Sequence, residues 1–295
     1  MSVSNYEICI PTLNRLDPLC FNMLHENEHI HLNMFVRQEL LDNGFYDSWK
    51  NMDRVNVISL GYGLEELGET RERIMNWCRM HKVKYCLMLD DGVKRVYLND
   101  GVNRDVNAVM NRAITRLEND MFGSKCIGMT FHKIFGIKDG QSKLCPSLPK
   151  RDYFNVVPTQ AVLLDVERVS AAGLHYQSLK RVGFEDCAFF VDAIKKQCVY
   201  AADDNICFDA IVPNAKKSGG SHANLNYDLE TKYDEQMKRC FEYIGPMFGV
   251  HMEKRYRKYA ECLLTMIEFN LDYFYEVLVQ DRENNRKIFE KKFTF

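Results

Sequence analysis

Two adjacent carboxylates, Asp90 and Asp91, come directly after an apolar run at Tyr85–Leu89. Such a run is typical of a strand that is buried on both faces, and open α/β sheets bind ligands beyond the carboxyl ends of their strands. Carboxylates at that place can hold a hard divalent cation that also binds a diphosphate, or accept hydrogen bonds from a ribose. The structural alternative is a plain turn, because Asp-Gly, here Asp91-Gly92, is a common turn dipeptide.

A second candidate is Arg71, which lies in the segment 68–73 at the start of a predicted helix. A cation at a helix start is unfavourable for the helix dipole. A diphosphate held by the helix N-terminus and by Arg71 would explain the placement. The alternative is an exposed arginine that pairs with Glu69 or Glu72, an arrangement that contributes little stability.

Two later segments complete the set of candidates. Glu185 and Asp186 open an apolar segment that is typical of a helix. They are either its cap or, if they face the same crevice as Asp90 and Asp91, a source of a general base. The segment Ser218–His222 follows two lysines, Lys216 and Lys217, and could close over phosphates with His222 as a metal or phosphate ligand. A plain linker explains that segment equally well.

The elements that must position these residues alternate between strand and helix through the first two-thirds of the chain. The predicted strands are Tyr6–Ile10, Ile30–Val36, Val55–Leu60, Tyr85–Leu89, Cys126–Thr130 and Ala161–Leu164. The predicted helices are Thr70–His81 and Asn103–Leu117, and a loop is expected over Gly136–Lys150. This alternation favours a mostly parallel α/β sheet. From Asp228 onward the pattern is helical, so we expect an α/β domain over 1–225 and a helical C-terminal extension over 226–295.

Composition and charge exclude several classes of protein. The chain has 295 residues, of which 46% are hydrophobic and 27% are charged, and these globular values exclude disordered and fibrous proteins. Lys and Arg number 39 against 41 Asp and Glu, a formal net charge of -2, so the chain lacks the bulk basic charge of many nucleic-acid binders. Its cations gather locally, most densely at Lys254–Lys258. That cluster is either a solvated helix face or a contact to a phosphate backbone.

The cysteines and the N-terminus bear on compartment. The chain has 11 cysteines, none in a CxxC pair and most within apolar runs. We expect buried, reduced thiols, and neither a disulfide framework nor a zinc-ribbon site. No signal-peptide pattern is visible at Met1–Tyr6 and no apolar run approaches transmembrane length. These observations predict a soluble cytoplasmic protein without a membrane partner.

Taken in order, these blocks resemble GT-A glycosyltransferases. The series is Pro11-Thr12 with Arg15 after the first strand, the arginine segment 68–73, the Asp-Asp block, and Gly-Phe-Glu-Asp at 183–186. The closest likeness is to the TET/JBP-associated DNA glycosyltransferases of phages, which are related to the base J glucosyltransferase. It rests on the Met-Leu-Asp-Asp and Gly-Phe-Glu-Asp blocks and on the aromatic-rich segment 132–154 leading to Asn155. The resemblance covers about residues 6–222 and leaves out the helical tail.

The resemblance implies a Rossmann-like mixed sheet with helices on both faces. It also implies inverting transfer of a sugar from a UDP-sugar to the hydroxyl of a hydroxymethylated pyrimidine in DNA, in the cytoplasm of a bacterial host if the chain is phage-encoded. It assigns the nucleotide pocket to Pro11, Thr12 and Arg15, the donor contact to Arg71, and the diphosphate and metal site to Asp90 and Asp91. Asp186 would be the catalytic base, Glu185 would steer the acceptor, and His222 would join Asp91 on a manganese or magnesium ion.

Two points leave alternatives open. Where relatives often have a third aspartate this chain has Gly92, which weakens the expected metal site and allows a non-catalytic binding protein of the same fold. The near-neutral charge slightly favours a glycan, protein or small-molecule acceptor over DNA. If the acceptor is DNA, its base must leave the stack. Duplex contacts are then expected from Lys254, Arg255 and Lys258 and from the segment Gly136–Arg151.

Overall fold

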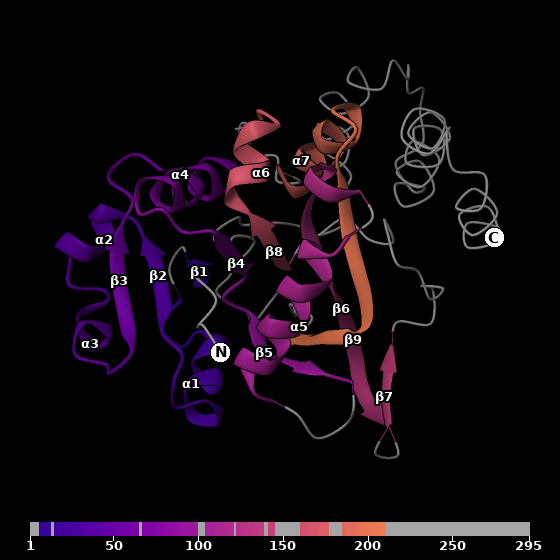
Figure 1. The fold of residues 1–295 in the computed structure, drawn as a ribbon. Helices are drawn as coiled ribbons and strands as arrows, with labels where there is room; N and C mark the ends of the chain where they lie inside the picture. The colour runs from indigo at the N-terminus through magenta and orange to yellow at the C-terminus, as the bar shows by residue number, and fades with distance from the viewer. Residues whose placement is uncertain are drawn as a thin grey trace, which may run out of the picture.

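The computed structural model describes residues 6–12, 15–64, 67–99, 104–120, 122–138, 141–144, 160–176 and 185–210. In these ranges the strands form one sheet with helices packed against it (Figure 1). The strands are β1 (Tyr6–Pro11), β2 (Leu32–Val36), β3 (Val55–Ser59), β4 (Tyr85–Leu89), β5 (Val93–Leu98), β6 (Cys126–Lys138), β7 (Gln141–Leu144), β8 (Ala161–Asp165) and β9 (Val199–Ala210). The α-helices are α1 (Asn22–Glu26), α2 (Gln38–Asp42), α3 (Asp47–Lys50), α4 (Leu67–Met80), α5 (Val106–Glu118), α6 (Val166–Ala171) and α7 (Glu185–Lys195). Short 3-10 turns lie at Leu19–Phe21 and Gly123–Lys125.

The sheet is mixed. Its strand order is β3-β2-β1-β4-β8-β6-β9-β5, and β7 pairs with β6. The strands β3, β2, β1 and β4 are parallel to one another, whereas β8 is antiparallel to both of its neighbours, β4 and β6. The chain is therefore an α/β protein with a Rossmann-like mixed sheet, as the resemblance implies. The mostly parallel sheet expected from the alternation is right for the first four strands and for the pair β6 and β9, whereas the other pairs are antiparallel. A buried apolar run has the same pattern in either direction.

The strand order reverses between β1 and β4. The chain adds β2 and β3 on one side of β1 and then returns to place β4 on the other side. This arrangement is the topological switch point at which open α/β sheets bind their ligands. The register pairs Cys9 with Met88, so the two strands end near the same edge. Thr12 follows β1 there, and Asp90 follows β4.

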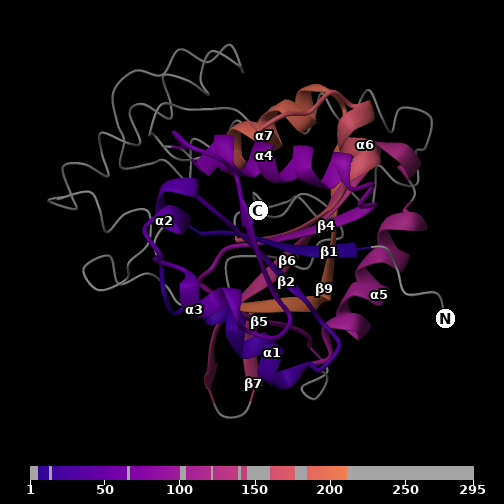
Figure 2. The same ribbon diagram turned by 90° about the vertical axis from the view of Figure 1, so that its left-hand side faces the viewer.

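Helices cover both faces of the sheet. Side chains alternate along β1, and Cys9 meets Cys78 of α4 with 3.8 Å between their sulfur atoms. On the other face, the Tyr6 hydroxyl donates to Asn107 of α5 at 2.7 Å. Figure 2 shows α4, α6 and α7 together above the sheet. The five residues of β4 between these layers are all buried, as its continuous apolar run predicts.

Several elements differ from the sequence prediction. The strand expected over Cys126–Thr130 continues to Lys138, and β7 turns back along it, so the loop expected over Gly136–Lys150 begins instead as a hairpin. That hairpin projects past the rest of the sheet in Figure 1. The extension is stabilised by β9, because residue 132 pairs with Cys207 of that strand. The sequence pattern around β6 does not reveal a pairing partner so far away in the chain.

The expected helical extension over 226–295, with Lys254, Arg255 and Lys258, and the segment Ser218–His222 lie outside the described residues, so both stay predictions. In the described ranges, no helix has the length and the apolar character needed to cross a membrane.

Candidate active site

The first half of the site lies at the carboxyl end of β1. The Thr12 hydroxyl donates to Asp91 Oδ2 at 3.1 Å, and Arg15 Nη1 lies 3.5 Å from Asp91 Oδ1. The backbone is fixed as well, because the Leu19 amide donates to the Asp91 carbonyl at 2.9 Å. Pro11, the last residue of β1, pairs in register with Phe35 of β2. Residues predicted to line a nucleotide pocket are thus beside one of the predicted diphosphate residues.

The second half of the site is organised by a buried arginine. The Arg71 side chain is 2% exposed, and its Nη2 lies 3.0 Å from Asp90 Oδ1 while its Nε lies 3.4 Å from Glu185 Oε1. The Tyr176 ring lies beside the guanidinium, with 5.8 Å from its centroid to Cζ. One cation therefore joins the end of β4 to the start of α7, two segments far apart in the sequence.

This geometry excludes one of the two interpretations of Arg71. It is not the exposed cation paired with Glu69 or Glu72, since Glu69 pairs with Arg73 at 2.7 Å and Glu72 pairs with Arg79 at 3.0 Å. Arg71 holds two carboxylates in place from within the protein. The donor contact predicted for it stays a prediction.

Burial raises the pKa values of the carboxyl groups around Arg71. It raises the pKa of Asp90 to about 6, an effect that Arg71 opposes and that the charges of Asp91 and Asp186 reinforce. Burial likewise raises the pKa of Glu185 to about 7, again against Arg71. The charge of Asp186 contributes to both shifts, so Asp186 lies in the same electrostatic neighbourhood as the end of β4. Carboxyl groups with pKa values this close to neutrality are frequent at functional sites.

Because Gly92 has no side chain, there is space next to the guanidinium of Arg15. A Cβ built at Gly92 would lie 3.6 Å from Arg15 Nη1, an ordinary contact distance. A third aspartate at this position would therefore project toward Arg15. In this chain the guanidinium of Arg15 lies next to the place where the resemblance leads one to expect a carboxylate.

The carboxylates themselves are a poor cation site. Both oxygens of Asp91 already face Thr12 or Arg15, and Oδ1 of Asp90 faces Arg71. Within the part of the chain that the structure describes, no His, Cys or Glu joins Asp90 and Asp91 in a group of three cation donors. His222, the other predicted ligand, lies outside that part. The residues of the described ranges therefore do not fit the implied divalent ion.

Two residues near the site were not predicted from the sequence. Arg37 follows β2 directly, as Asp90 follows β4. Open α/β sheets bind ligands beyond the carboxyl ends of their strands, and applying this rule to β2 as well would have found Arg37. Tyr46 is fully buried. Burial raises its pKa to about 12, and the charges of Asp91 and Arg37 act on it in opposite directions. No sequence signal marks Tyr46, because the turn and short helix around it carry no clear period.

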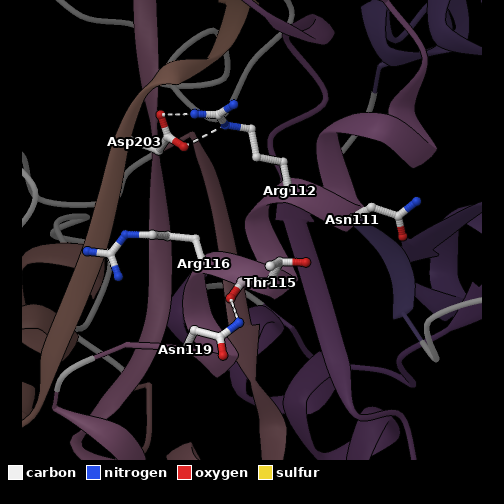
Figure 3. A pocket seen from close by; sticks show the side chains of 6 residues that line it. All are labelled: Asn111, Arg112, Thr115, Arg116, Asn119 and Asp203. Carbon is white, nitrogen blue, oxygen red and sulfur yellow. Dashed lines mark hydrogen bonds and ion pairs between the residues drawn. The ribbon is translucent and has the colours of Figure 1, made fainter.

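A separate hollow lies between α5 and β9, with a volume of about 500 Å³. Its lining residues are Asn111, Arg112, Thr115, Arg116, Asn119 and Asp203 (Figure 3). None of the candidate site residues belongs to it. The guanidinium of Arg112 is held by both carboxylate oxygens of Asp203, at 2.6 and 3.2 Å, so this cation is already paired. The hollow adds nothing to the site at the strand ends.

Comparison with known proteins finds similarity in structure but none in sequence family. No family model matches this chain, and no curated protein matches it either. A solved 4-diphosphocytidyl-2C-methyl-D-erythritol synthase is similar with 12% identity and a TM-score of 0.38, covering 72% of this chain and 95% of that one. The synthase from Anaerococcus prevotii is similar with 10% identity and a TM-score of 0.38, covering 72% and 93%. These likenesses are weak, and the fold class given above rests on the strand order of this chain.

Proposed function

We propose that this chain is a glycosyltransferase that moves a sugar from a UDP-sugar to the hydroxyl of a hydroxymethylated pyrimidine base in DNA, with inversion. The supporting observation is the meeting of two clusters at the β1/β4 switch point. One cluster is Thr12, Arg15 and Asp91, and the other joins Asp90 to the start of α7 through Arg71. Ligands of open α/β sheets bind at this place, and the residues are those to which the resemblance assigns donor binding and catalysis.

On the donor side, Arg15 is the cation best placed for the leaving diphosphate. Its side chain is 18% exposed, whereas Arg71 is buried. A guanidinium offers paired donors that match phosphate oxygens, and stabilising the charge that develops on a leaving group is a large part of catalysis. In this proposal Thr12 and Asp91 orient Arg15, Pro11 lines the pocket, and Asp90 accepts from the nucleotide. The divalent cation predicted from the resemblance would have to compete with Arg15 for Asp91.

On the acceptor side, the proposed base is Asp186. The acceptor oxygen attacks the anomeric carbon and forms the new C–O bond while its proton passes to Asp186. The bond between the sugar and the phosphate oxygen breaks, and the nucleoside diphosphate leaves. Glu185 is paired with Arg71, so it fixes the start of α7 and thereby the position of the next residue, besides the acceptor-steering role that the resemblance gives it. A positioned base of this kind contributes on the order of 10²–10⁴ in rate.

The proposal that the acceptor is DNA is more specific than the proposal of a donor site. Its support is the resemblance, and it requires the target base to be flipped out of the duplex. The proposed phosphate contacts are Lys254, Arg255 and Lys258, together with the segment 136–151. The formal charge of -2 favours a second candidate, in which the same donor site serves a glycan, a protein or a small molecule.

The test is incubation of the purified chain with radiolabelled UDP-sugars and duplex DNA containing hydroxymethyluracil or hydroxymethylcytosine. Label in the DNA is the expected result, and unmodified DNA is the matched control. Hydrolysis of the donor without transfer would support the second candidate. If UDP fails to bind in calorimetry, with or without magnesium or manganese, the donor proposal is wrong. UDP binding without turnover on any acceptor would indicate a non-catalytic binding protein.

A further inference from the structure

Three cysteines from three different elements meet beneath α4. Cys9 of β1, Cys78 of α4 and Cys86 of β4 are each 0% exposed, and their sulfur atoms all lie within 4.8 Å of one another. The pair Cys9 and Cys78 is 3.8 Å apart. No short sequence motif predicts this cluster, because its members come together only when the parallel strands and α4 pack.

We propose that Cys9, Cys78 and Cys86 form a trigonal thiolate site for a soft monovalent cation, Cu(I). This site is separate from the one at the strand ends and does not depend on the proposed transferase activity.

The distances fit such a site with small movements. A metal–thiolate bond is about 2.3 Å long, so three sulfur atoms around a central ion in one plane lie about 4.0 Å apart. The observed 3.8 Å and the 4.8 Å limit bracket that value. A disulfide would instead need sulfur atoms about 2.05 Å apart, which requires a much larger shift of packed elements.

The number and type of donors favour copper over zinc. Structural zinc sites take four ligands, but no fourth His, Cys, Asp or Glu joins this cluster among the residues that the structure describes. Full burial also keeps bulk water from the fourth position. Cu(I) prefers thiolate and thioether ligands, and Met88 pairs in register with Cys9 on the same face of the sheet.

The cluster also joins two layers of the fold, since Cys78 lies in α4 whereas Cys9 and Cys86 lie in the adjacent strands β1 and β4. A bound ion would tie α4 to both β1 and β4.

The site is closed, so loading is expected during folding rather than by diffusion into the folded chain. The full-length protein is unfolded and refolded without oxygen, with Cu(I) supplied as its acetonitrile complex in competition with a Cu(I) chelator. We expect one copper per refolded chain, with thiolate-to-copper charge-transfer absorption and a shell of three sulfur atoms in X-ray absorption. We also expect a higher melting temperature with copper than without.

Matched variants separate the cluster from the other cysteines, since the chain has 11. Cys78→Ser should lose the bound copper and the copper-dependent rise in melting temperature. Cys198→Ser, which alters a buried cysteine outside the cluster, should keep both. If Cys78→Ser does not fold, Cys86→Ala decides in its place. Copper uptake unchanged in the cluster variant, or no uptake by the refolded parent, would overturn the proposal and leave the cysteines as small apolar core residues.

Discussion

Replacing Arg71 with methionine is the sharpest test of the charge arrangement at the site. Methionine keeps a long, flexible apolar side chain but removes the cation that pairs with Asp90 at 3.0 Å and with Glu185 at 3.4 Å. The buried carboxyl group of Glu185 and the partly buried one of Asp90 then lose their common partner. The cost should depend on pH, because it exists only while those groups are ionised.

The magnitude follows from the pKa values. With Arg71 present, the pKa of Asp90 is about 6 and that of Glu185 about 7, both raised above their ordinary values by burial. A raised folded-state pKa means that the folded protein binds more protons than the unfolded chain, so these groups lower stability as the pH rises toward 7. Losing Arg71 raises both pKa values further. At pH 8 we expect about 3–5 kcal/mol of destabilisation, as for a buried ion pair that loses one partner. At pH 5 the carboxyls carry protons, and about 1 kcal/mol is expected, as for an ordinary substitution.

The assay is urea unfolding at pH 5 and pH 8, followed by tryptophan fluorescence. The chain has two tryptophans, Trp49 in α3 and Trp77 in α4, so the signal reports on the described fold. Arg112→Met is the matched control, since it removes a half-exposed cation from Asp203, whose pKa is lowered, chiefly by its hydrogen bond with Arg112 against the effect of burial. That control should cost about 0–1 kcal/mol at both pH values. An Arg71→Met penalty that is equal at pH 5 and pH 8 would refute the electrostatic reasoning and make Arg71 a packing residue.

Three further predictions concern the proposed reaction. Asp186→Asn keeps the shape of the helix start but removes the base, so turnover should fall on the order of 10²–10⁴-fold with donor binding preserved in calorimetry; a parent-like rate would mean that Asp186 is a cap. Turnover should persist in excess EDTA, because Arg15 faces the space beside Gly92, and Gly92→Asp should weaken donor binding in EDTA while making it respond to added manganese. Abolition of the parent's activity by EDTA would contradict this assignment. Neutral replacements at Arg255 and Lys258 should raise the KM for DNA and reduce the salt slope by about one for each lost phosphate contact, and unchanged kinetics at raised salt would direct the search to the segment 136–151.

Local patterns were sufficient to predict β4 and the carboxylates after it. The run Tyr85–Leu89 has the predicted bounds, because a continuous apolar stretch between polar residues has few other solutions. The start of α7 was also predicted, since Glu185 and Asp186 precede an apolar helical segment. Features that depend on contacts between distant parts of the sequence could not be predicted in this way. The direction of β8, the length of β6 and the pairing of Arg71 with Glu185 each depend on segments that no local window contains.

The same dependence shapes the assembly of the site. The four strands β1 to β4 and helix α4 come from the first third of the chain, so Arg71 and Asp90 can meet while the rest is still unfolded. Glu185 joins them only after the long intervening segment has closed, and forming such distant contacts is the slow part of folding. We therefore expect a nascent chain that ends before α7 to hold the Thr12, Arg15 and Asp91 cluster without its proposed base. Assembly order thus separates the proposed donor side of the site from its proposed acceptor side in time.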